Sequence, residues 1–558
     1  MIELHIPWLE LAVLLPALGA LLLGRGGRPE VNWYRSVWFN GLTLVCATGA
    51  WWDFGTLHTW EAHDRWSVFS TVFGHEMLVI DELSAPLLPL AALLYLLTTL
   101  TTLRTKQRRF SFSWNLLSES ILMATLACKD PWGVIALLTL ATLPPAIELR
   151  ARGRSLRVYA LHMGLFVALM IIGYAMVERA GRDAVHSAWA MAPLIAAVLI
   201  RSGVVPLHCW MTDLFENATF GTALLFVTPM TGAYAAMRLI MPIAPDWALQ
   251  SIAVLSLLTS VYAAGMAMVQ HEARRFFCYL LLSHASLVLV GLELATPIGL
   301  TGALSIWLSV GLSLGGFGLT LRCMESRTGR LTLDGFHGYA EQAPVLASFF
   351  LLTGLASVGF PGTIGFIAIE LMVESALDVF PVAGLAVIIA AAINGIAVVN
   401  AFFRIFTGTR HITTISLGSR PRERFAVLTL TLLILGGGLY PQPGIHSRHH
   451  AAMKLLEERA QSGAITDESL KRELSGEHDG DTEDDGDPEH DGDPEHDGDP
   501  EHDGDPGQDG AGGQEGGLEQ EVAPGIEDNA EPSGAVRLGG DEVISVPPTT
   551  GVSEDTPN

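Results

Sequence analysis

Ionisable side chains stand inside several long apolar stretches of the chain, where a proton or another ion could be carried. The strongest candidates occur in the segments NLLSESILMATLACKD, AAVLIRSGVVPLHCW, CYLLLSHASLVLV and GFPGTIGFIAIELMVE, and they are Glu119, Arg201, His284 and Glu370. A charge inside a bilayer is costly unless it faces the protein interior or water, so each residue is a candidate for ion translocation. His208 follows Arg201 near the end of the same stretch and joins them.

A structural interpretation stands beside the functional one at each of these positions. A lone histidine in a membrane span is often a hydrogen-bonded core residue, which applies to His284 and with more weight to His162. Arg201 could be the structural partner of an acid, and Glu370 could lie at a solvated interface. The residue types alone leave both interpretations open.

Two of the candidate residues lie close to proline residues that should break a helix. Pro206 follows Arg201, and Pro361, between Gly359 and Gly362, precedes Glu370. Proline removes a backbone hydrogen bond and frees a carbonyl, which a membrane tolerates only beside protein or water. Paired broken helices with ion sites at the breaks are typical of transporters. The pattern therefore predicts an ion-translocating helix bundle with breaks at Pro206 and Pro361.

The elements that must position these residues are transmembrane helices. Of the 558 residues, 50% are hydrophobic and 16% are charged, which excludes an ordinary soluble domain. Apolar stretches long enough to cross a bilayer recur along the chain, and they are too long and too little alternating to be strands. They lie near residues 8–24, 34–52, 80–103, 113–128, 131–149, 157–177, 187–206, 219–240, 248–269, 276–294, 299–322, 346–375, 381–407 and 424–440. We therefore expect an all-α, polytopic membrane bundle of about 14 transmembrane helices, two of them broken, and no strands.

The loop charges predict the orientation of this bundle. The loops after the third and fifth spans are basic, at residues 104–109 and 150–157, whereas the loop after the second span is acidic. Basic loops stay in the cytoplasm, so the N-terminus is expected outside. An even number of spans places the acidic C-terminal tail outside as well. The first apolar run lacks a basic leader and a small-residue cleavage site, so we expect it to be a mature span.

The C-terminal part of the chain is a different object from the apolar body. Residues 461–558 carry 30 acidic and 3 basic side chains, and from residue 477 the sequence repeats units such as EHDGDP without apolar residues. Such a segment cannot form a core, so we expect disorder. Weak, multi-site binding of divalent cations by the repeat is an alternative role. The expected organisation is a transmembrane domain over 1–445, a juxtamembrane linker over 446–476 with a short helix at 451–460, and a disordered tail over 477–558.

Several function classes find no support in the sequence. The five cysteines are scattered without metal-ligand spacing, and no phosphate-binding or dinucleotide-binding glycine motif is present. A nearly neutral body with an anionic tail excludes nucleic-acid binding. We therefore expect no metal, no cofactor and no catalytic residue within this chain.

Motifs around the candidate residues resemble a known family. RSGVVPLHCWMTDLFENATFGTALL is similar to K-x-P-x-x-P-x-H-x-W-x-P-D-A-x-x-x-A-P-T-x-G-S, with Arg201 at the lysine and His208 at the histidine. QHEARRFFCYLLLSHASLVLVGL is similar to Q-x-D-x-K-R-x-x-A-Y-S-S-x-S-H-M-G, with Tyr279 and His284 in place. The block through GFPGTIGF and the segment GLYPQP also match. The chain resembles the antiporter-like membrane subunits of respiratory complex I, of the subunit M or subunit 4 type.

This resemblance implies a function for the assembly that contains the chain. The family's members translocate protons or Na⁺ in the membrane while NADH:quinone oxidoreduction occurs elsewhere in the complex. The chain is then a non-catalytic translocating subunit of a bacterial inner membrane. It would be surrounded by lipid and by other membrane subunits, with a half-channel built on its broken spans. A cation/proton antiporter subunit, an inorganic-carbon uptake subunit and a non-conducting scaffold are the alternatives.

Several positions depart from the proton path that the family's pattern implies. Thr139 stands where the family has an acid in the fifth span, Met230 where it has a second lysine, and Val310 where it has a histidine. The acid of the twelfth span appears one position late, at Glu370, with Ile369 in the expected place. Arg201 replaces a lysine, and arginine does not release its proton in proteins. Either the path runs through Glu119, His284 and Glu370, or the chain couples differently, or it does not conduct. With Thr139 in the acid's place, Glu119 is the expected ionic partner of Arg201.

Reporter fusions test the expected topology. Fusions at Lys106 and Arg154 should report a cytoplasmic location, and a fusion after Pro443 should report the opposite side, because the basic loops hold the first two positions inside. A cytoplasmic signal after Pro443 would contradict the predicted orientation.

Overall fold

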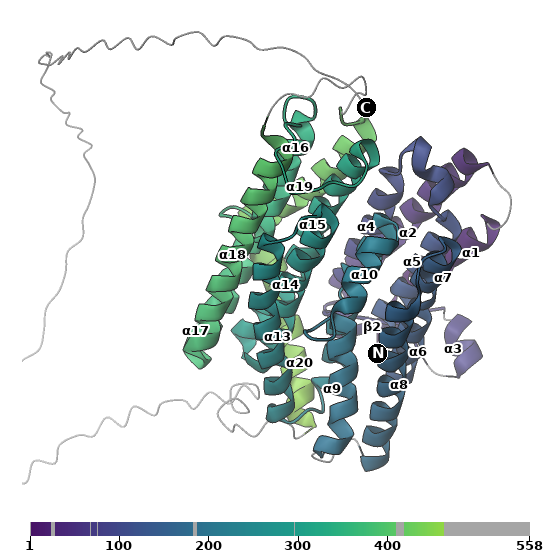
Figure 1. Ribbon diagram of the computed structural model, residues 1–558. Helices are drawn as coiled ribbons and strands as arrows, with labels where there is room; N and C mark the ends of the chain where they lie inside the picture. The colour runs from purple at the N-terminus through teal and green to yellow at the C-terminus, as the bar shows by residue number, and fades with distance from the viewer. Residues whose placement is uncertain are drawn as a thin grey trace, which may run out of the picture. The chain divides into compact units, whose positions relative to one another are not determined.

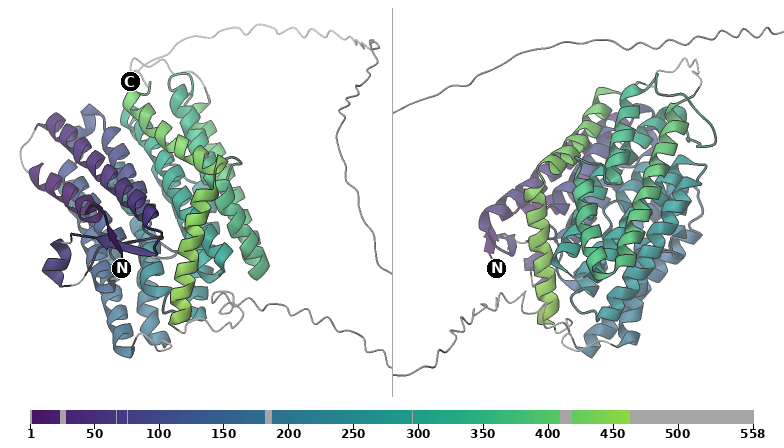
Figure 2. Two further views of the ribbon diagram at one scale, coloured as in Figure 1. Left: turned by 180° about the vertical axis from the view of Figure 1, so that it is seen from behind. Right: turned by 90° about the vertical axis from the view of Figure 1, so that its left-hand side faces the viewer.

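The computed structural model describes residues 2–23, 28–66, 68–74, 76–181, 187–294, 296–408 and 418–462. All of them belong to one compact unit, Met1–Gly480, in which helices lie alongside one another as a bundle (Figures 1 and 2). The expected acidic tail at 477–558 lies outside the described residues.

Helices make up most of the described chain. The first half contains α1 (Trp8–Leu22), α2 (Pro29–Leu57), α3 (Val68–Phe73), α4 (Leu87–Leu100), the 3₁₀ helix η1 (Arg104–Arg109), α5 (Phe112–Ala127), α6 (Pro131–Ala141), α7 (Leu143–Ala151) and α8 (Arg157–Ala180). The second half contains α9 (Ala188–Ser202), α10 (Cys209–Asn217), α11 (Phe220–Val227), α12 (Thr231–Ala235), the π-helix η2 (Ala236–Ile240), α13 (Asp246–Met268), α14 (Ala273–Leu294), α15 (Pro297–Thr328), α16 (Pro344–Ser357), α17 (Ile364–Val379), α18 (Pro381–Phe406), α19 (Pro421–Leu439) and α20 (Gln442–Gln461).

The helical membrane architecture expected from the sequence is confirmed. Every apolar stretch that was expected to span the membrane contains one or more helices. Among the described residues, seven helical stretches are long and apolar enough to cross a membrane, and an eighth results if α19 and α20, bent by 80°, are counted together. The stretch at 346–375 is divided into α16 and α17. The chain is an integral, multi-pass, mainly helical membrane protein.

The expectation that the chain contains no strands is wrong. β1 (Ile2–Leu4), β2 (Glu61–Asp64) and β3 (Val79–Asp81) form a small sheet in the order β1-β2-β3. β1 runs parallel to β2, with Ile2 opposite Ala62, and β2 runs antiparallel to β3. Strands of three or four residues are too short to show alternation in the sequence. Their pairing gives hydrogen-bond partners to backbone groups in the connection between α2 and α4.

The sheet positions the first membrane helix through a carboxylate. Asp64, at the end of β2, accepts hydrogen bonds from the backbone N–H groups of Leu9 at 3.3 Å and Glu10 at 2.7 Å, at the start of α1. These N–H groups have no partner within the helix, and the helix N-terminus favours negative charge. Burial nevertheless raises the pKa of Asp64 to about 6, against the effect of these hydrogen bonds.

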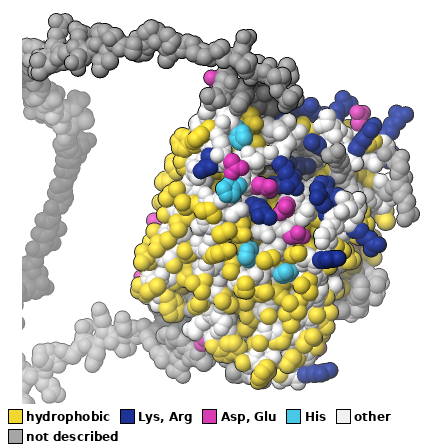
Figure 3. Space-filling view, viewed as in Figure 1, with side chains coloured by type: hydrophobic (Ala, Val, Ile, Leu, Met, Phe, Trp, Pro, Cys, Tyr) yellow, Lys and Arg dark blue, Asp and Glu magenta, His cyan; other side chains and the backbone are white. Residues whose placement is uncertain are grey.

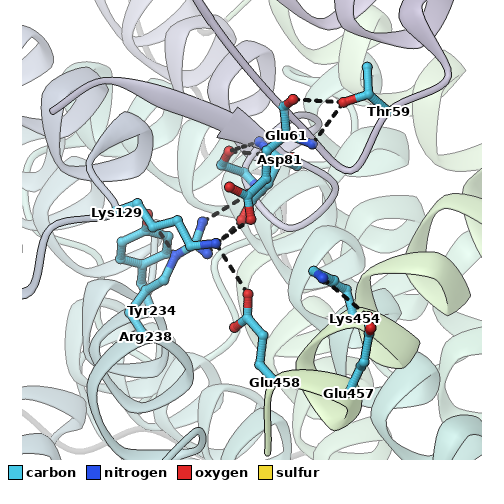
Figure 4. Close-up of polar contacts among 10 residues, drawn as sticks. Thr59, Glu61, Asp81, Lys129, Tyr234, Arg238, Lys454, Glu457 and Glu458 are labelled. Atoms are coloured by element: carbon cyan, nitrogen blue, oxygen red, sulfur yellow. Dashed lines mark hydrogen bonds and ion pairs between the residues drawn. The ribbon is translucent and has the colours of Figure 1, made fainter. Parts of the chain in front are cut away.

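Helix α20 is bound to the bundle by its basic and acidic side chains. Lys129 lies between Glu61 of β2 and Glu458 of α20, with 3.1 Å from its Nζ to the Glu458 carboxylate (Figure 4). The buried guanidinium of Arg459 donates to the carbonyl of Met241 at 3.0 Å and to the carboxylate of Asp246 at 2.6 Å. α20 therefore packs on the bundle, runs through the boundary expected at residue 445 and includes the helix expected at 451–460.

A buried ion pair joins the sheet to the second half of the chain. Asp81 at the end of β3 accepts two hydrogen bonds from the guanidinium of Arg238 in η2, at 2.5 and 2.8 Å (Figure 4). Burial alone would raise the pKa of Asp81, but the charge and hydrogen bonds of Arg238 lower it to about 2. The Nε–H of Arg238 also donates to the Tyr234 hydroxyl at 3.1 Å. Breaking such a pair typically costs about 3–5 kcal/mol, so this contact holds residues far apart in the sequence together.

The raised pKa of Asp64 predicts a pH-dependent stability. Its native pKa of about 6 exceeds the ordinary 3.8, so its stabilising contribution is complete below pH 3.8 and is lost as pH rises through about 6. Raising the pH from 5 to 7 should lower the free energy of unfolding by about 1 kcal/mol. Thermal unfolding of the purified protein in detergent measures this change. Asp64→Asn keeps an acceptor oxygen without titrating, so an equal pH dependence in this variant would contradict the assignment.

Candidate ion-translocation site

The expected helix break at Pro206 is present. α9 ends at Ser202, Gly203 adopts a left-handed conformation with φ of +73°, and α10 begins at Cys209. Side chains of the surrounding protein bind the backbone groups that the break frees. The Trp210 indole donates to the carbonyl of Ile200 at 2.8 Å, and the N–H of Val205 donates to the Thr259 hydroxyl at 3.0 Å. Irregular backbone at membrane depth requires such enclosure by protein.

Arg201 lies at the end of α9 directly before this break. Its side chain is buried, and one guanidinium nitrogen donates to the carbonyl of Phe226 at 3.2 Å. The guanidinium carbon lies 4.1 Å from the centre of the Phe226 ring and 5.6 Å from that of the Trp210 ring. A cation over aromatic faces is attracted by the ring quadrupole. Among the described residues no carboxylate forms an ion pair with Arg201, so a carbonyl and two rings surround this charge.

The expected pairing of Arg201 with Glu119 is wrong. Glu119 is completely buried in α5, and neither of its carboxylate oxygens has a hydrogen-bond partner among the described residues. α5 packs against α1, α2, α4 and α6, whereas α9 packs against α8, α12 and α13. Although position 139 has no acid, no other acid pairs with Arg201 among the described residues. The packing of a whole helix against its neighbours, and not one charge, decides which side chains meet.

A small cavity of about 20 Å³ adjoins Arg201. Its lining includes Ser202, Met230 and Ala285, the neighbour of His284 in α14. Within the described part of the chain, the Arg201 Nε and the Ser202 hydroxyl have no hydrogen-bond partner. The volume is large enough for one water molecule, and Arg201 and Ser202 are the polar side chains of a mostly apolar lining. Met230 adopts a left-handed φ of +49° at the start of α12, so the residue at the family's second lysine position lines the space beside Arg201.

His284 lies next to a buried polar cluster that the sequence analysis did not assign. Its ring is 1% exposed, and its Nε2 has no hydrogen-bond partner among the described residues. The adjacent Ser283 accepts a hydrogen bond from Asn394 of α18 at 2.8 Å and donates to the carbonyl of Ser260 in α13 at 2.8 Å. Asn394 could have been singled out from the sequence, because its amide side chain stands inside the apolar stretch at 381–407. The residue before His284 thus belongs to a cluster of hydroxyl and amide groups contributed by α13, α14 and α18.

His208 lies at the start of α10 and faces α14. Its ring centre is 5.9 Å from that of Tyr262 and 5.8 Å from that of Tyr279, whose hydroxyl is 3.5 Å from the histidine Nε2. Tyr279 precedes His284 on α14 by little more than one helical turn. The packing of the broken α9–α10 segment against α14 therefore brings Arg201, His208 and the neighbourhood of His284 together.

Glu370 does not join this buried group. The expected break at Pro361 is present between α16 and α17, with Gly359 and Gly362 at φ of +84° and +83°. Glu370 on α17 is exposed, whereas Ile369 packs partly against the core. One residue turns a helix by about 100°. The acid that appears one position late in the family's pattern consequently lies on the outer side of α17.

The other departures from the family's pattern leave no substitute carrier at their positions. Thr139 donates its hydroxyl to the carbonyl of Ile135 in its own helix at 2.8 Å, and Val310 is buried in α15. Glu148 of α7, which the sequence analysis did not single out, accepts hydrogen bonds from the backbone of Thr219 at 2.7 Å and from the Thr222 hydroxyl. It fixes the start of α11.

Comparisons with known proteins agree with this architecture. A family described as NADH:quinone oxidoreductase/Mrp antiporter, transmembrane, matches residues 155–394. The NAD(P)H-quinone oxidoreductase chain 4 of Acaryochloris marina is 29% identical over 265 residues, a match that covers 44% of this chain and 49% of that protein. The chain 4 protein of a Synechococcus strain is 28% identical over 480 residues, covering 79% of this chain and 91% of its own length.

Solved structures share the fold. Respiratory complex I from Thermus thermophilus contains a chain with a TM-score of 0.71 and 22% identity, covering 81% of this chain and 99% of that one. A chain of the Mrp complex from Dietzia has a TM-score of 0.69 and 19% identity, covering 82% and 98%. The fold is that of a chain of respiratory complex I and of a chain of the Mrp complex. The matched family, the relatives and the shared fold support the resemblance to the antiporter-like membrane subunits of complex I that the motifs indicated.

A double-mutant cycle tests the separation of Arg201 from Glu119. The effects of Arg201→Ala and Glu119→Gln on the free energy of unfolding should add to within about 0.5 kcal/mol, because no contact couples the two side chains. Thermal unfolding of the single and double variants in detergent gives these values. Arg238→Ala with Asp81→Asn is the matched control, since these residues form a direct ion pair and should show coupling of about 1–3 kcal/mol. Recovery of stability in the Arg201→Ala, Glu119→Gln double variant would show that the two charges interact.

Proposed function

We propose that the chain translocates protons or Na⁺ as a membrane subunit of a complex I-like assembly, coupled to NADH:quinone oxidoreduction in other subunits. The carrying observation is the arrangement at the α9–α10 break, where a buried arginine that has no carboxylate partner among the described residues adjoins a helix bearing the buried His284. The matched family and the names of the relatives support the same role. The alternative role, a cation/proton antiporter subunit, is favoured by the structural likeness to the Mrp complex.

The proton carriers in this proposal are Glu119 and His284, and polar groups that can relay protons lie on and around the helix that bears His284. A carboxyl and an imidazole both bind and release protons, whereas a guanidinium keeps its charge. Arg201 acts as a fixed cation that sets the local electric field. His208 with Tyr279, and Ser283 with Asn394, supply groups that can pass a proton along hydrogen bonds toward α13 and α18. Glu370 acts at the outer side of α17.

We propose the same topology that the loop charges predicted. Fourteen spans result when α6–α7, α9–α10, α11–α12–η2, α16–α17 and α19–α20 are each counted as one broken span and the short α3 is left out. Lys and Arg side chains gather toward one end of the bundle, the upper end in Figure 3, which supports a cytoplasmic location for that end. The N-terminus and the acidic tail then lie outside the bacterial inner membrane.

Other membrane subunits are the proposed partners. The similar chains in complex I, in the Mrp complex and in an archaeal sulfane sulfur reductase are parts of membrane complexes. The exposed Glu370 on α17 supports a neighbour on this face, because a charge facing lipid is costly and a polar partner would reduce that cost. Purification of the native complex and identification of its subunits would distinguish the respiratory role from an antiporter or an inorganic-carbon uptake system.

Transport by the native complex in vesicles tests the assignment of carriers. Glu119→Gln and His284→Gln should each reduce proton flux about 100-fold, as expected when a proton-transfer group is lost, whereas Arg201→Lys should retain flux because the positive charge remains. His162→Gln is the matched control, since His162 lies in α8 and bonds the carbonyl of Val158 in its own helix at 2.8 Å. Unchanged flux in all four variants would favour the non-conducting scaffold.

A further inference from the structure

A second cavity, outside the proposed ion path, lies at the end of the bundle where basic residues gather. Its volume is about 260 Å³, and it is bordered by the end of α4, by η1 and by the adjoining ends of α11, α14 and α15. Five basic side chains and one acidic side chain line it, namely Lys106, Arg152, Arg274, Arg322, Arg330 and Glu325.

Three of the five basic side chains are neutralised by acids. Arg274 makes two hydrogen bonds to Glu325, at 2.5 and 2.8 Å. Arg152 lies 3.9 Å from Glu148, and Arg330 lies 3.8 Å from Glu272. In the described part of the chain, Arg322 and Lys106 form no ion pair, so these two charges give the lining its positive excess.

Arg322 is held in place by neutral groups. Its guanidinium donates to the carbonyl of Thr98 at 2.6 Å and to the hydroxyls of Thr101 and Thr102 at 2.9 and 2.7 Å, and it lies 5.4 Å from the centre of the Phe110 ring. A guanidinium has five N–H donors, so these three hydrogen bonds leave others for a ligand. Arg322 is partly buried, and these contacts fix its orientation, which makes it a built anion-binding group, unlike a flexible surface lysine.

We propose that this cavity binds a phosphate group, with an anionic phospholipid headgroup as its source. Basic pockets between transmembrane helices at the cytoplasmic side suit such headgroups, and a guanidinium matches the geometry of phosphate oxygens. Lys106, exposed on η1, supplies the second charge at the rim. Arg322 lies within two turns of the end of α15. A side chain this close to the end of a membrane helix lies at the level of the lipid headgroups. The proposal does not depend on ion translocation by the chain.

Binding to the delipidated full-length chain in detergent tests the proposal. Phosphatidylglycerol, the zwitterionic phosphatidylcholine and inorganic phosphate are titrated separately, with bound species counted by native mass spectrometry. Phosphatidylglycerol should bind more tightly than phosphatidylcholine, and Lys106→Ala should weaken its binding about fivefold, the effect of one basic residue near a membrane surface. Arg108→Ala is the matched control, because Arg108 is exposed on the same 3₁₀ helix but does not line the cavity.

The outcomes separate the two sources of phosphate. Arg322→Lys, which keeps the charge but loses the fork of donors, should weaken binding of phosphatidylglycerol further while preserving the thermal stability of the fold. If only inorganic phosphate binds, and Lys106→Ala weakens that binding, the cavity takes free phosphate. This result supports the phosphate site and overturns the lipid headgroup as its source. Equal binding of the two lipids together with no phosphate binding overturns the proposal. Equal effects of Lys106→Ala and Arg108→Ala overturn it as well.

Discussion

The satisfaction of backbone groups at the helix breaks is the constraint on which the site depends. Proline at position 206 stops the helix in the middle of the bundle, where lipid would offer no hydrogen-bond partners to the backbone groups that the break frees. The indole of Trp210 binds Ile200, and the hydroxyl of Thr259 binds Val205. Both partners come from neighbouring segments that must therefore pack tightly on the break. Arg201 and the cavity beside it exist in this enclosed space because the chain could not leave the break open to lipid.

The helices and both breaks could be predicted from the sequence because the responsible forces are local. Length and hydrophobicity define a span, and the ring of Pro206 or Pro361 interrupts it whatever surrounds it. The buried position of Glu119, Arg201 and His284 followed from the same argument, since an ionisable group in an apolar span is turned toward protein. These predictions required no knowledge of which helices are neighbours.

The features that sequence reasoning missed all depend on neighbours. The Arg201–Glu119 pair was inferred from a missing acid, but the packing of α5 and α9 separates the two residues. The three strands are too short to have a pattern of their own, and β1 exists through pairing with a segment about 60 residues later in the chain. Glu370 stands one position later than the acid of the family's motif. The motif can still be recognised with this shift, but one residue turns a helix by about 100° and so places the side chain on another face.

The replacement of a lysine by Arg201 changes what the break can do while the fold is kept. A lysine beside a broken helix can alternate between charged and neutral forms, so the field it exerts changes during a transport cycle. Arg201 keeps its charge, and in the part of the chain that the structure describes a carbonyl and two aromatic rings surround it, with no acid in ion-pair contact. A constant positive charge favours anions nearby and opposes the entry of cations. Any alternation in this chain must therefore occur at carboxyl and imidazole groups, and of the buried residues predicted from the sequence only Glu119 and His284 have that chemistry.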